Sequence, residues 1–452
     1  MKRLLWLVLL LSPAFALQPG WKEADINADG TKEHVAITNL ADIAFNDQGQ
    51  IVGWYVKTVR GADLKGNYSR AVNLVSSKFL PPGTLNNFQP EPGRTSFTQK
   101  DGKMVAEFHQ GATHLTYTVD PRFHSVEISV ASPEARILTW SGIGTSKSVV
   151  TKWLGQGETA PSASGQGSAS YLSWQTQPSK GYTFVLTPLE GALDSRFAAK
   201  DGGAVAEIQV PAGKPIRFLA YGGPNEMVRL HVEKLLDLPG LFTPNTLGYL
   251  SLGLLWVMER IYSFSGSWAL AIALLTVLVR LLLWPLMHQQ FKSMAEMKKI
   301  QPLIEDINKK FKDSAEKRAE ATMKLYQEHR INPLGGCLPI FLQMPIMIVL
   351  YNVIRNYEFG QGFLWLKDLA LADPFYILPV LYIGLTSLST WLSSTGSREM
   401  TRQLIFMNLI FAFLIVSLPA GVSLYWILST GVGLVQQWLI NRQLGIKPFG
   451  AH

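Results

Sequence analysis

Hydrophobic and polar positions alternate with a period of two residues through the first half of this chain. In SVEISV, Val126, Ile128 and Val130 fall on one face, and THLTYTVD, YTFVLTPL and AVAEIQV repeat the pattern between Gly, Pro and Asp residues. This alternation is typical of strands that bury one face. No long helical period interrupts it, so we predict a β-sandwich over residues 18–223. The Gly- and Ser-rich stretch 155–170 predicts a mobile surface loop.

A Gly-Gly-Pro sequence at residues 222–224 predicts the end of this domain. The next segment, EMVRLHVEKLLDL, places Val228, Val232, Leu235 and Leu236 on one helical face. An amphipathic helix lying on the outer surface of a membrane fits this pattern. A terminal helix packed on the β-domain fits it too. We assign residues 224–266 to this amphipathic interfacial helix and a connector.

The second half of the chain changes to long apolar segments. Five of them are candidate membrane spans, and Arg280 is the only charged residue in the set: 267–287, 334–354, 374–394, 404–418 and 424–440. Pro419-Ala-Gly separates the last two and predicts a tight turn. We therefore expect a five-span α-helical transmembrane domain over residues 267–442, followed by a short tail, 443–452.

The N-terminus indicates on which side of a membrane the β-domain lies. Lys2 and Arg3 precede an apolar run, Leu4–Leu11, and the small-residue triplet Ala14-Phe15-Ala16 follows. This arrangement predicts a cleavable signal peptide over residues 1–17, with an uncleaved signal anchor as the alternative. Both interpretations place residue 18 onward outside the cytoplasm.

Positive charge between the apolar segments supports the same orientation. The loop 288–331 holds ten Lys and Arg residues, whereas the loop 355–373 holds two. This asymmetry puts the basic loop and the C-terminal tail in the cytoplasm. Apolar positions at three- and four-residue steps predict a cytoplasmic helical hairpin over 288–331, with Pro302 interrupting the first helix and DSAE at 313–316 starting the second. The hairpin is either a solvated, orienting segment or a docking site for partners.

Composition adds limits on function. The net charge is +8, and positively charged residues are densest in that loop, so membrane topology explains them better than nucleic-acid binding. Cys337 is the only cysteine, which excludes an internal disulfide. The sequence lacks a Walker A loop, HExxH and G-x-S-x-G. We therefore predict a protein that is not an enzyme and needs no cofactor.

Metal binding has one weak candidate in the sequence. Asp25, Asn27 and Asp29 match the start of a calcium loop, but Ala36 stands at its twelfth position in place of Glu. An ordinary Asx turn is the plainer interpretation. The eight histidines lack metal-ligand spacing, and we interpret His109, His114 and His124 as surface or core residues.

Arg280 is the residue that most needs an explanation. A charge at the centre of a membrane helix costs about 2.5–3.5 kcal/mol. The predicted spans contain no Asp or Glu that could pair with it, which also argues against a proton-coupled transporter. Arg280 either extends its side chain to the cytoplasmic interface or lines a wet cavity, with Thr276 one turn away on the same face.

Four motifs in order closely resemble the YidC membrane-protein insertase family, whose relatives are the mitochondrial Oxa and chloroplast Alb proteins. They are GSWALAIALLTVLVRLLLWPL, NPLGGCLPIFLQMPI, DPFYILPVL and PAGVSLYW, and the resemblance covers about residues 225–442. The preceding β-domain is similar to the periplasmic β-supersandwich of Gram-negative members.

The resemblance implies an insertase and chaperone of the bacterial inner membrane, working alone or with the Sec translocon. Arg280 and Thr276 match groove residues of the family, Tyr425 and Trp426 match its aromatic pair, and Gln343 lies in the second conserved span. The resemblance also implies nascent membrane proteins and the lipid bilayer as partners, with ribosome and signal-recognition machinery possible at 288–331. Many members have a second tyrosine where this chain has Trp426.

Two other functions compete with this interpretation. The β-sandwich favours a membrane-anchored periplasmic protein that binds or acts on carbohydrate, by fold analogy alone. A channel or transporter is the second, and the missing intramembrane carboxylates argue against it.

Overall fold

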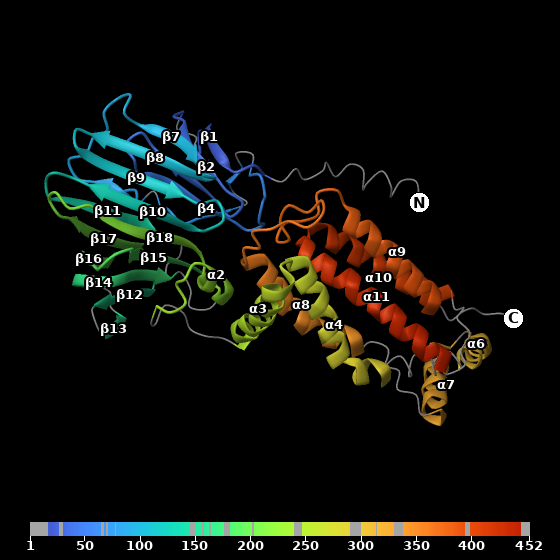
Figure 1. Cartoon of the computed structure of the whole chain (residues 1–452). Helices are drawn as coiled ribbons and strands as arrows, with labels where there is room; N and C mark the ends of the chain where they lie inside the picture. The colour runs from blue at the N-terminus through green and yellow to red at the C-terminus, as the bar shows by residue number, and fades with distance from the viewer. Residues whose placement is uncertain are drawn as a thin grey trace. The chain divides into compact units, whose positions relative to one another are not determined.

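The computed structural model divides the described chain into two compact units, one up to residue 249 and one from residue 250 onward (Figure 1). We describe each unit by itself. The structure describes residues 17–26, 30–64, 67–68, 71–76, 78–143, 150–155, 158–161, 164–175, 181–200, 203–238, 246–289, 300–312, 314–329, 338–393 and 398–443.

The first unit contains two antiparallel sheets. The smaller has the order β1-β2-β3-β4-β5. Its strands are β1 (Gly20–Ala24), β2 (Glu33–Ile37), β3 (Ala41–Phe45), β4 (Ile51–Lys57) and β5 (Ala71–Asn73). Each strand pairs with its neighbour in the sequence, so this sheet is a simple meander.

The larger sheet has the order β6-β11-β17-β16-β14-β15-β18-β10-β9-β8-β7, and β12 and β13 extend from β14 (Figure 1). Its strands are β6 (Thr84–Leu85), β7 (Ser96–Lys100), β8 (Lys103–Gln110), β9 (Thr113–Val119), β10 (Ser125–Ala131), β11 (Arg136–Ile143), β12 (Val150–Gly155), β13 (Glu158–Pro161), β14 (Ser164–Gln175), β15 (Tyr182–Pro188), β16 (Leu193–Lys200), β17 (Gly203–Val210) and β18 (Ile216–Pro224).

One core joins the two sheets, as predicted for a β-sandwich. Phe45 and Trp54 of the small sheet and Tyr117 and Trp174 of the large sheet belong to the same buried cluster. The alternation read from SVEISV is confirmed, because Val126, Ile128 and Val130 are all fully buried. Interleaved side chains from two sheet faces are the usual core of such a domain.

The prediction of a mobile loop over residues 155–170 is wrong. β12, β13 and β14 cover most of it, and β14 pairs with β12, β15 and β16. Small residues such as Gly165 and Ala169 are poor strand formers alone, but Gly165 pairs with β16 and Ala169 pairs with β12 and β16. The pairing of β14 with other strands of the large sheet therefore makes this segment a strand, although its own sequence favours a loop.

The helix after β18 packs on the β-domain, which was the second of its two interpretations. α2 (Met227–Val232) is shorter than its apolar stripe, and Leu230 and Leu235 bury against Tyr171, Val185 and Tyr221. The carboxylate of Glu233 also accepts bonds from the His124 backbone N–H and the Ser125 hydroxyl, both at 2.7 Å. The compact unit consequently extends to residue 249 and does not end at 223.

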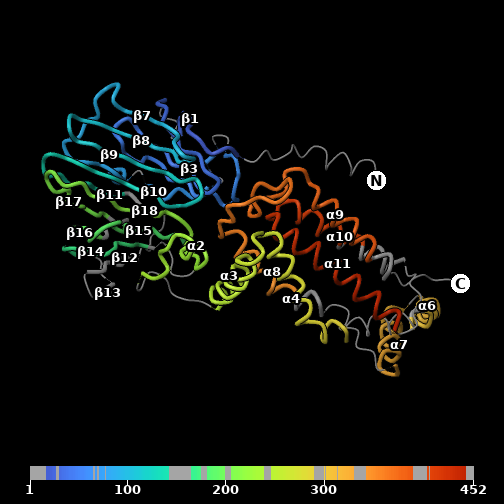
Figure 2. Tube along the Cα trace, in the orientation of Figure 1, coloured from blue at the N-terminus to red at the C-terminus, as the bar shows by residue number. Residues whose placement is uncertain are grey.

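The second unit consists of helices (Figure 2). They are α3 (Thr246–Ser265), α4 (Trp268–Leu282), α6 (Gln301–Lys310), α7 (Ala315–Glu328), α8 (Leu338–Asn356), α9 (Ile377–Ser393), α10 (Arg398–Ser417) and α11 (Ala420–Gln443). Each of the five apolar segments overlaps one of these helices, with ends that differ by several residues for α8, α10 and α11, whereas α3 lies in the predicted connector. Within the described residues, no helix has both the length and the hydropathy of a membrane span.

α11 is central to the packing of the helical unit, because it contacts α4, α8 and α9. Pro419 ends the preceding segment as predicted, since α10 ends at Ser417 and α11 begins at Ala420. In the hairpin, Pro302 occupies the first turn of α6, and the Ser314 hydroxyl caps α7 by accepting from the Lys317 N–H at 3.4 Å. α6 and α7 bury Ile300 against Leu325.

Candidate functional site

Arg280 projects from α4 onto α11. Its Nε donates a hydrogen bond to the hydroxyl of Ser429 at 2.9 Å, and its Nη1 lies 3.7 Å from the sulfur of Met287. The side chain is half-buried. Among the residues that the structure describes, no carboxylate lies within 4.0 Å of this guanidinium. Within the described part of the chain, Arg280 is therefore a positioned cation without a carboxylate at ion-pair distance.

The guanidinium lies against a glycine of the facing helix. A Cβ built on Gly433 would lie 3.6 Å from both Nη1 and Nη2 of Arg280. Tyr425, Ser429 and Gly433 are four residues apart and share one face of α11. This face therefore presents a hydroxyl to Nε and a residue without a side chain to the two terminal nitrogens, which can still donate to an incoming acceptor.

Gln343 and Tyr425 extend the polar line to a third helix. Nε2 of Gln343, on α8, donates to the phenol oxygen of Tyr425 at 3.0 Å. Tyr425 is 1% exposed, so its ring is a packing element and its hydroxyl is the group that meets α8. Two of the predicted residues thus contact each other, and Ser429 links their face of α11 to Arg280.

Thr276 lies on the same helix as Arg280 but turns its hydroxyl elsewhere. The side chain is 1% exposed, and its Oγ1 donates to the Ile272 carbonyl at 2.7 Å. Such a bond to the preceding turn satisfies the hydroxyl within the helix. The structure therefore places Thr276 in the packing beneath Arg280, with its donor already used.

Trp426 faces another part of the bundle than Tyr425. Its ring packs 5.8 Å from Tyr382 of α9 and 5.2 Å from Phe411 of α10. Adjacent residues on a helix point about 100° apart, since one turn takes 3.6 residues. The aromatic pair expected from the sequence is therefore divided between two environments.

Sequence reasoning missed three residues around Arg280: Met287, Ser429 and Gly433. Ser429 and Gly433 carry a signal, because they follow Tyr425 at steps of four, the spacing of one helical face. Met287 carries none, since an apolar residue at a helix end has no distinguishing pattern. Gln436 is also fully buried, and its Nε2 donates to the Trp284 carbonyl at 3.5 Å, so α11 is tied to the segment that follows α4.

The structure describes only Asp25 of the three residues in the calcium-loop candidate. Asn27 and Asp29 lie outside the described residues. Asp25 accepts a hydrogen bond from the Gly30 N–H, five residues on, at 3.0 Å, and Ala36 is buried in β2. Within the described part of the chain, no group of three or more His, Cys, Asp or Glu side chains is placed to hold a metal ion.

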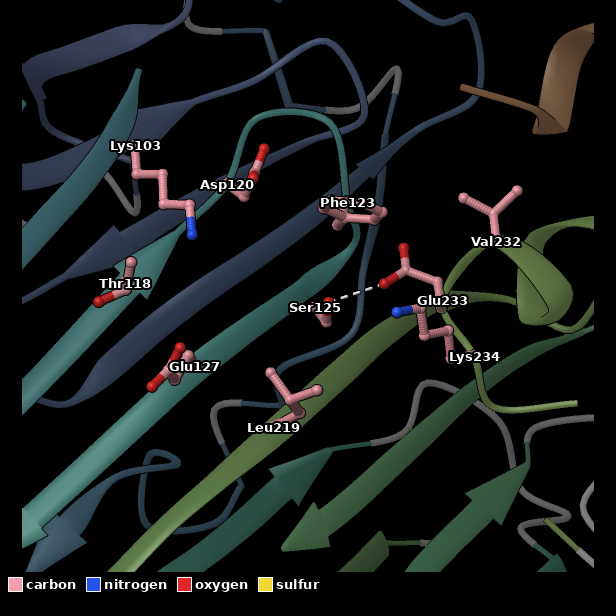
Figure 3. A pocket seen from close by; sticks show the side chains of 10 residues that line it. All are labelled: Lys103, Thr118, Asp120, Phe123, Ser125, Glu127, Leu219, Val232, Glu233 and Lys234. Carbon is pink, nitrogen blue, oxygen red and sulfur yellow. Dashed lines mark hydrogen bonds between the residues drawn. The ribbon is translucent and has the colours of Figure 1, made fainter. Parts of the chain in front are cut away.

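The β unit has a pocket of its own between the large sheet and the end of α2 (Figure 3). Its carboxylates already have partners: Glu233 accepts from Ser125, Glu127 from Arg217, and Asp120 from Arg122 at 2.7 Å. Burial alone would raise the pKa of Asp120, but hydrogen bonds from Arg122 and its charge outweigh that effect and lower the pKa. These carboxylates hold the fold together rather than presenting an acid–base pair.

Comparison with known proteins bears on both units. A family model described as 60Kd inner membrane protein matches residues 260–447. A membrane protein insertase YidC of Deinococcus radiodurans is 33% identical over 392 residues, covering 83% of this chain and 91% of that one. Another, from Polynucleobacter asymbioticus, is 36% identical over 237 residues, which are 50% of this chain and 42% of that one.

One solved structure, described as an active YidC insertase with the first transmembrane domain resolved, aligns with 97% of this chain and 98% of its own. The TM-score is 0.60 and the sequence identity is 23%. The two chains therefore share a fold, with a β-sheet domain and a helical region in the same order.

Proposed function

Since this chain belongs to the YidC family of membrane protein insertases, we propose that it inserts integral membrane proteins and that Arg280 receives the polar segment of each client. The family is one of inner-membrane proteins with a periplasmic domain, which in this chain is the β unit. The observation that supports the role of Arg280 is a half-buried guanidinium, held through Nε, whose charge has no nearby carboxylate within the described residues.

The proposed topology has five membrane spans. They contain α4, α8, α9, α10 and α11, and the hairpin of α6 and α7 and the C-terminal tail lie in the cytoplasm. Large apolar side chains on the surfaces of these helices support it: Leu282, Phe406 and Phe413 are 77%, 64% and 79% exposed. Apolar surface of this extent requires an apolar medium or a partner to cover it.

The physical obstacle to insertion is the polar segment of the client. Each backbone group that enters hydrocarbon without a hydrogen-bond partner costs several kcal/mol. A polar groove partway into the bilayer shortens the apolar path and solvates that segment. Arg280, Ser429, Tyr425 and Gln343 form such a polar line across three helices, and we place the groove there.

Arg280 acts on the client by charge. A guanidinium stays protonated and donates to carboxylates in a fixed, bidentate geometry. An acidic residue in the client is therefore attracted to Arg280 on its way across. The membrane potential, positive outside, then favours its export by about 2.3 kcal/mol per charge per 100 mV. The apolar remainder of the client partitions into lipid and supplies the net driving force.

No covalent step is needed in this mechanism. The chain binds the client, lowers the barrier to crossing and releases it into lipid. Partners at the cytoplasmic side, such as the ribosome or signal-recognition machinery, would meet the basic hairpin, whose Lys309, Lys317 and Lys324 are exposed. Cooperation with the Sec translocon belongs to the same proposal.

The test uses the full-length protein in liposomes and a single-span client with acidic residues in its short exported tail. Protease protection measures insertion by wild type, Arg280→Ala and Arg280→Lys. We expect the alanine variant to lose at least about tenfold, which corresponds to about 1.4 kcal/mol, and the lysine variant to retain most activity. Ser429→Ala should fall between them, because the charge remains but its position loosens.

A client with a neutral tail is the matched control, and its insertion should depend much less on Arg280. Equal insertion of the acidic client by wild type and Arg280→Ala would refute the role of Arg280. Insertion by wild type no better than by empty liposomes would refute the insertase function itself.

A further inference from the structure

The hairpin of β8 and β9 places two histidines side by side. Gln110 pairs with Thr113 across a two-residue turn, and His109 pairs with His114 at the next position. Residues directly opposite each other on antiparallel strands have Cβ atoms about 4.5–5.5 Å apart. The five-residue separation in sequence does not indicate this proximity; the hairpin register creates it.

The two imidazoles meet through their nitrogens. The Nδ1 atoms are 2.5 Å apart, and the rings stand at 81° to each other. Both side chains lie on the outer face of the large sheet, opposite the buried face formed by Met104, Ala106 and Phe108. His114 is exposed to solvent, so a solute can reach this pair.

The backbone that carries the pair is fixed on both sides. The Gly111 N–H donates to the carboxylate of Glu91 at 2.7 Å, and the Glu91 N–H donates to the His109 carbonyl at 2.8 Å. On the far side, the strand β10 places only the small Ala131 opposite His114. Rotation of the two imidazoles is therefore the one adjustment that a ligand between them requires.

We propose that His109 and His114 form a binding site for a divalent transition-metal cation, with Cu²⁺ bound more tightly than Zn²⁺ or Ni²⁺. Imidazole nitrogen suits these ions, and affinity at a given nitrogen site generally peaks at Cu²⁺. Bonds of about 2.0–2.1 Å to one ion require the two nitrogens to separate to about 3 Å. A small side-chain rotation achieves this, because His114 is exposed and its neighbour across β10 is the small Ala131.

The site would be an open one. The described residues provide no third His, Cys, Asp or Glu ligand beside the pair, so water or a ligand from solution completes the coordination. Two pre-positioned imidazoles explain why binding should exceed that of a single surface histidine: the second ligand is already in place when the first binds.

The experiment titrates Cu²⁺ into purified full-length protein in detergent, prepared without a polyhistidine tag. Calorimetry gives the stoichiometry and affinity, and electron paramagnetic resonance counts the coordinating nitrogens. We expect one Cu²⁺ per chain with two imidazole nitrogens. His109→Ala and His114→Ala should each weaken binding at least about tenfold, as loss even of an outer-shell partner does in metal sites.

His231→Ala is the matched control, because His231 is an exposed histidine of the same unit. It should bind like wild type, and unchanged thermal unfolding of all metal-free variants shows that they fold. Equal Cu²⁺ binding by wild type and the double variant His109→Ala/His114→Ala would overturn the proposal, as would a spectrum with a single nitrogen ligand in the wild type. Client insertion is not part of this readout, so the result is independent of the proposed function.

Discussion

The β unit and the helical unit differ in how far their large apolar side chains are exposed. Trp54, Trp140 and Trp174 of the β unit are at most 1% exposed, whereas Trp256 and Phe413 of the helical unit are 60% and 79% exposed. The β unit closes its core against water with its own two sheets. The helical unit instead exposes large apolar side chains, and a surface of this kind needs lipid or a partner to cover it.

Charged groups show the same contrast. In the β unit, Lys57 and Asp42 are buried together with 2.8 Å between Nζ and the carboxylate oxygen, and Nζ also donates to the Thr38 carbonyl. Burial raises the pKa of Asp42, and the neighbouring Lys57 offsets only part of that effect. In the helical unit, Arg280 is held by a serine. A buried ion pair such as Lys57–Asp42 stabilises the fold, whereas a guanidinium with unused donors can bind a ligand.

Removing a core aromatic should have the largest effect. Trp140 is fully buried between Phe184 and Phe218, and Trp140→Ala should lower the free energy of unfolding of the β unit by about 3–5 kcal/mol. Urea unfolding of the full-length protein, followed by near-ultraviolet circular dichroism, measures this. Trp256→Ala is the control, and a similar loss there would break the comparison between the two units.

A charge on the helical surface should have a smaller effect that depends on the medium. Phe413→Asp places a carboxylate on the exposed face of α10 and should destabilise the lipid-embedded protein by about 2.5–3.5 kcal/mol. Leu80→Asp, at a 60% exposed position of the β unit, should change stability by no more than about 0.5 kcal/mol. Thermal unfolding in nanodiscs measures both. Equal effects would show that α10 does not face lipid.

The smallest expected effect concerns a paired carboxylate of the β unit. The pKa of Asp120 lies below its ordinary value of 3.8, so the folded state favours the ionised form. Its stabilisation is therefore fully present above that ordinary pKa and is lost as pH falls through the lower, folded-state pKa. Asp120→Asn should unfold at a lower temperature than wild type at pH 7, and the difference should shrink toward pH 3. A difference independent of pH would contradict the pairing with Arg122. Asp101→Asn, in a neighbouring exposed turn, is the control.

Local sequence patterns were sufficient to predict those elements whose structure does not depend on contacts with distant parts of the chain. The alternation in β10, the helix start at Ser314 and the break at Pro419 were all predicted correctly. Prediction failed over residues 155–170, where β13 pairs with the adjacent β12 and β14 pairs with β16, which lies further along the chain. It also missed α3 (Thr246–Ser265), which we had treated as a connector.

The sequence alone determined that this chain has a strand-rich half and an apolar helical half, and that Arg280 is the exceptional charge in the latter, because composition and periodicity are local properties. Only the tertiary structure decided what surrounds that charge. Ser429 follows Arg280 by 149 residues, and Gln343 precedes Tyr425 by 82, so neither contact exists until the helices pack. The same holds for His109 and His114, whose nitrogens meet only because the register of one hairpin sets them opposite each other.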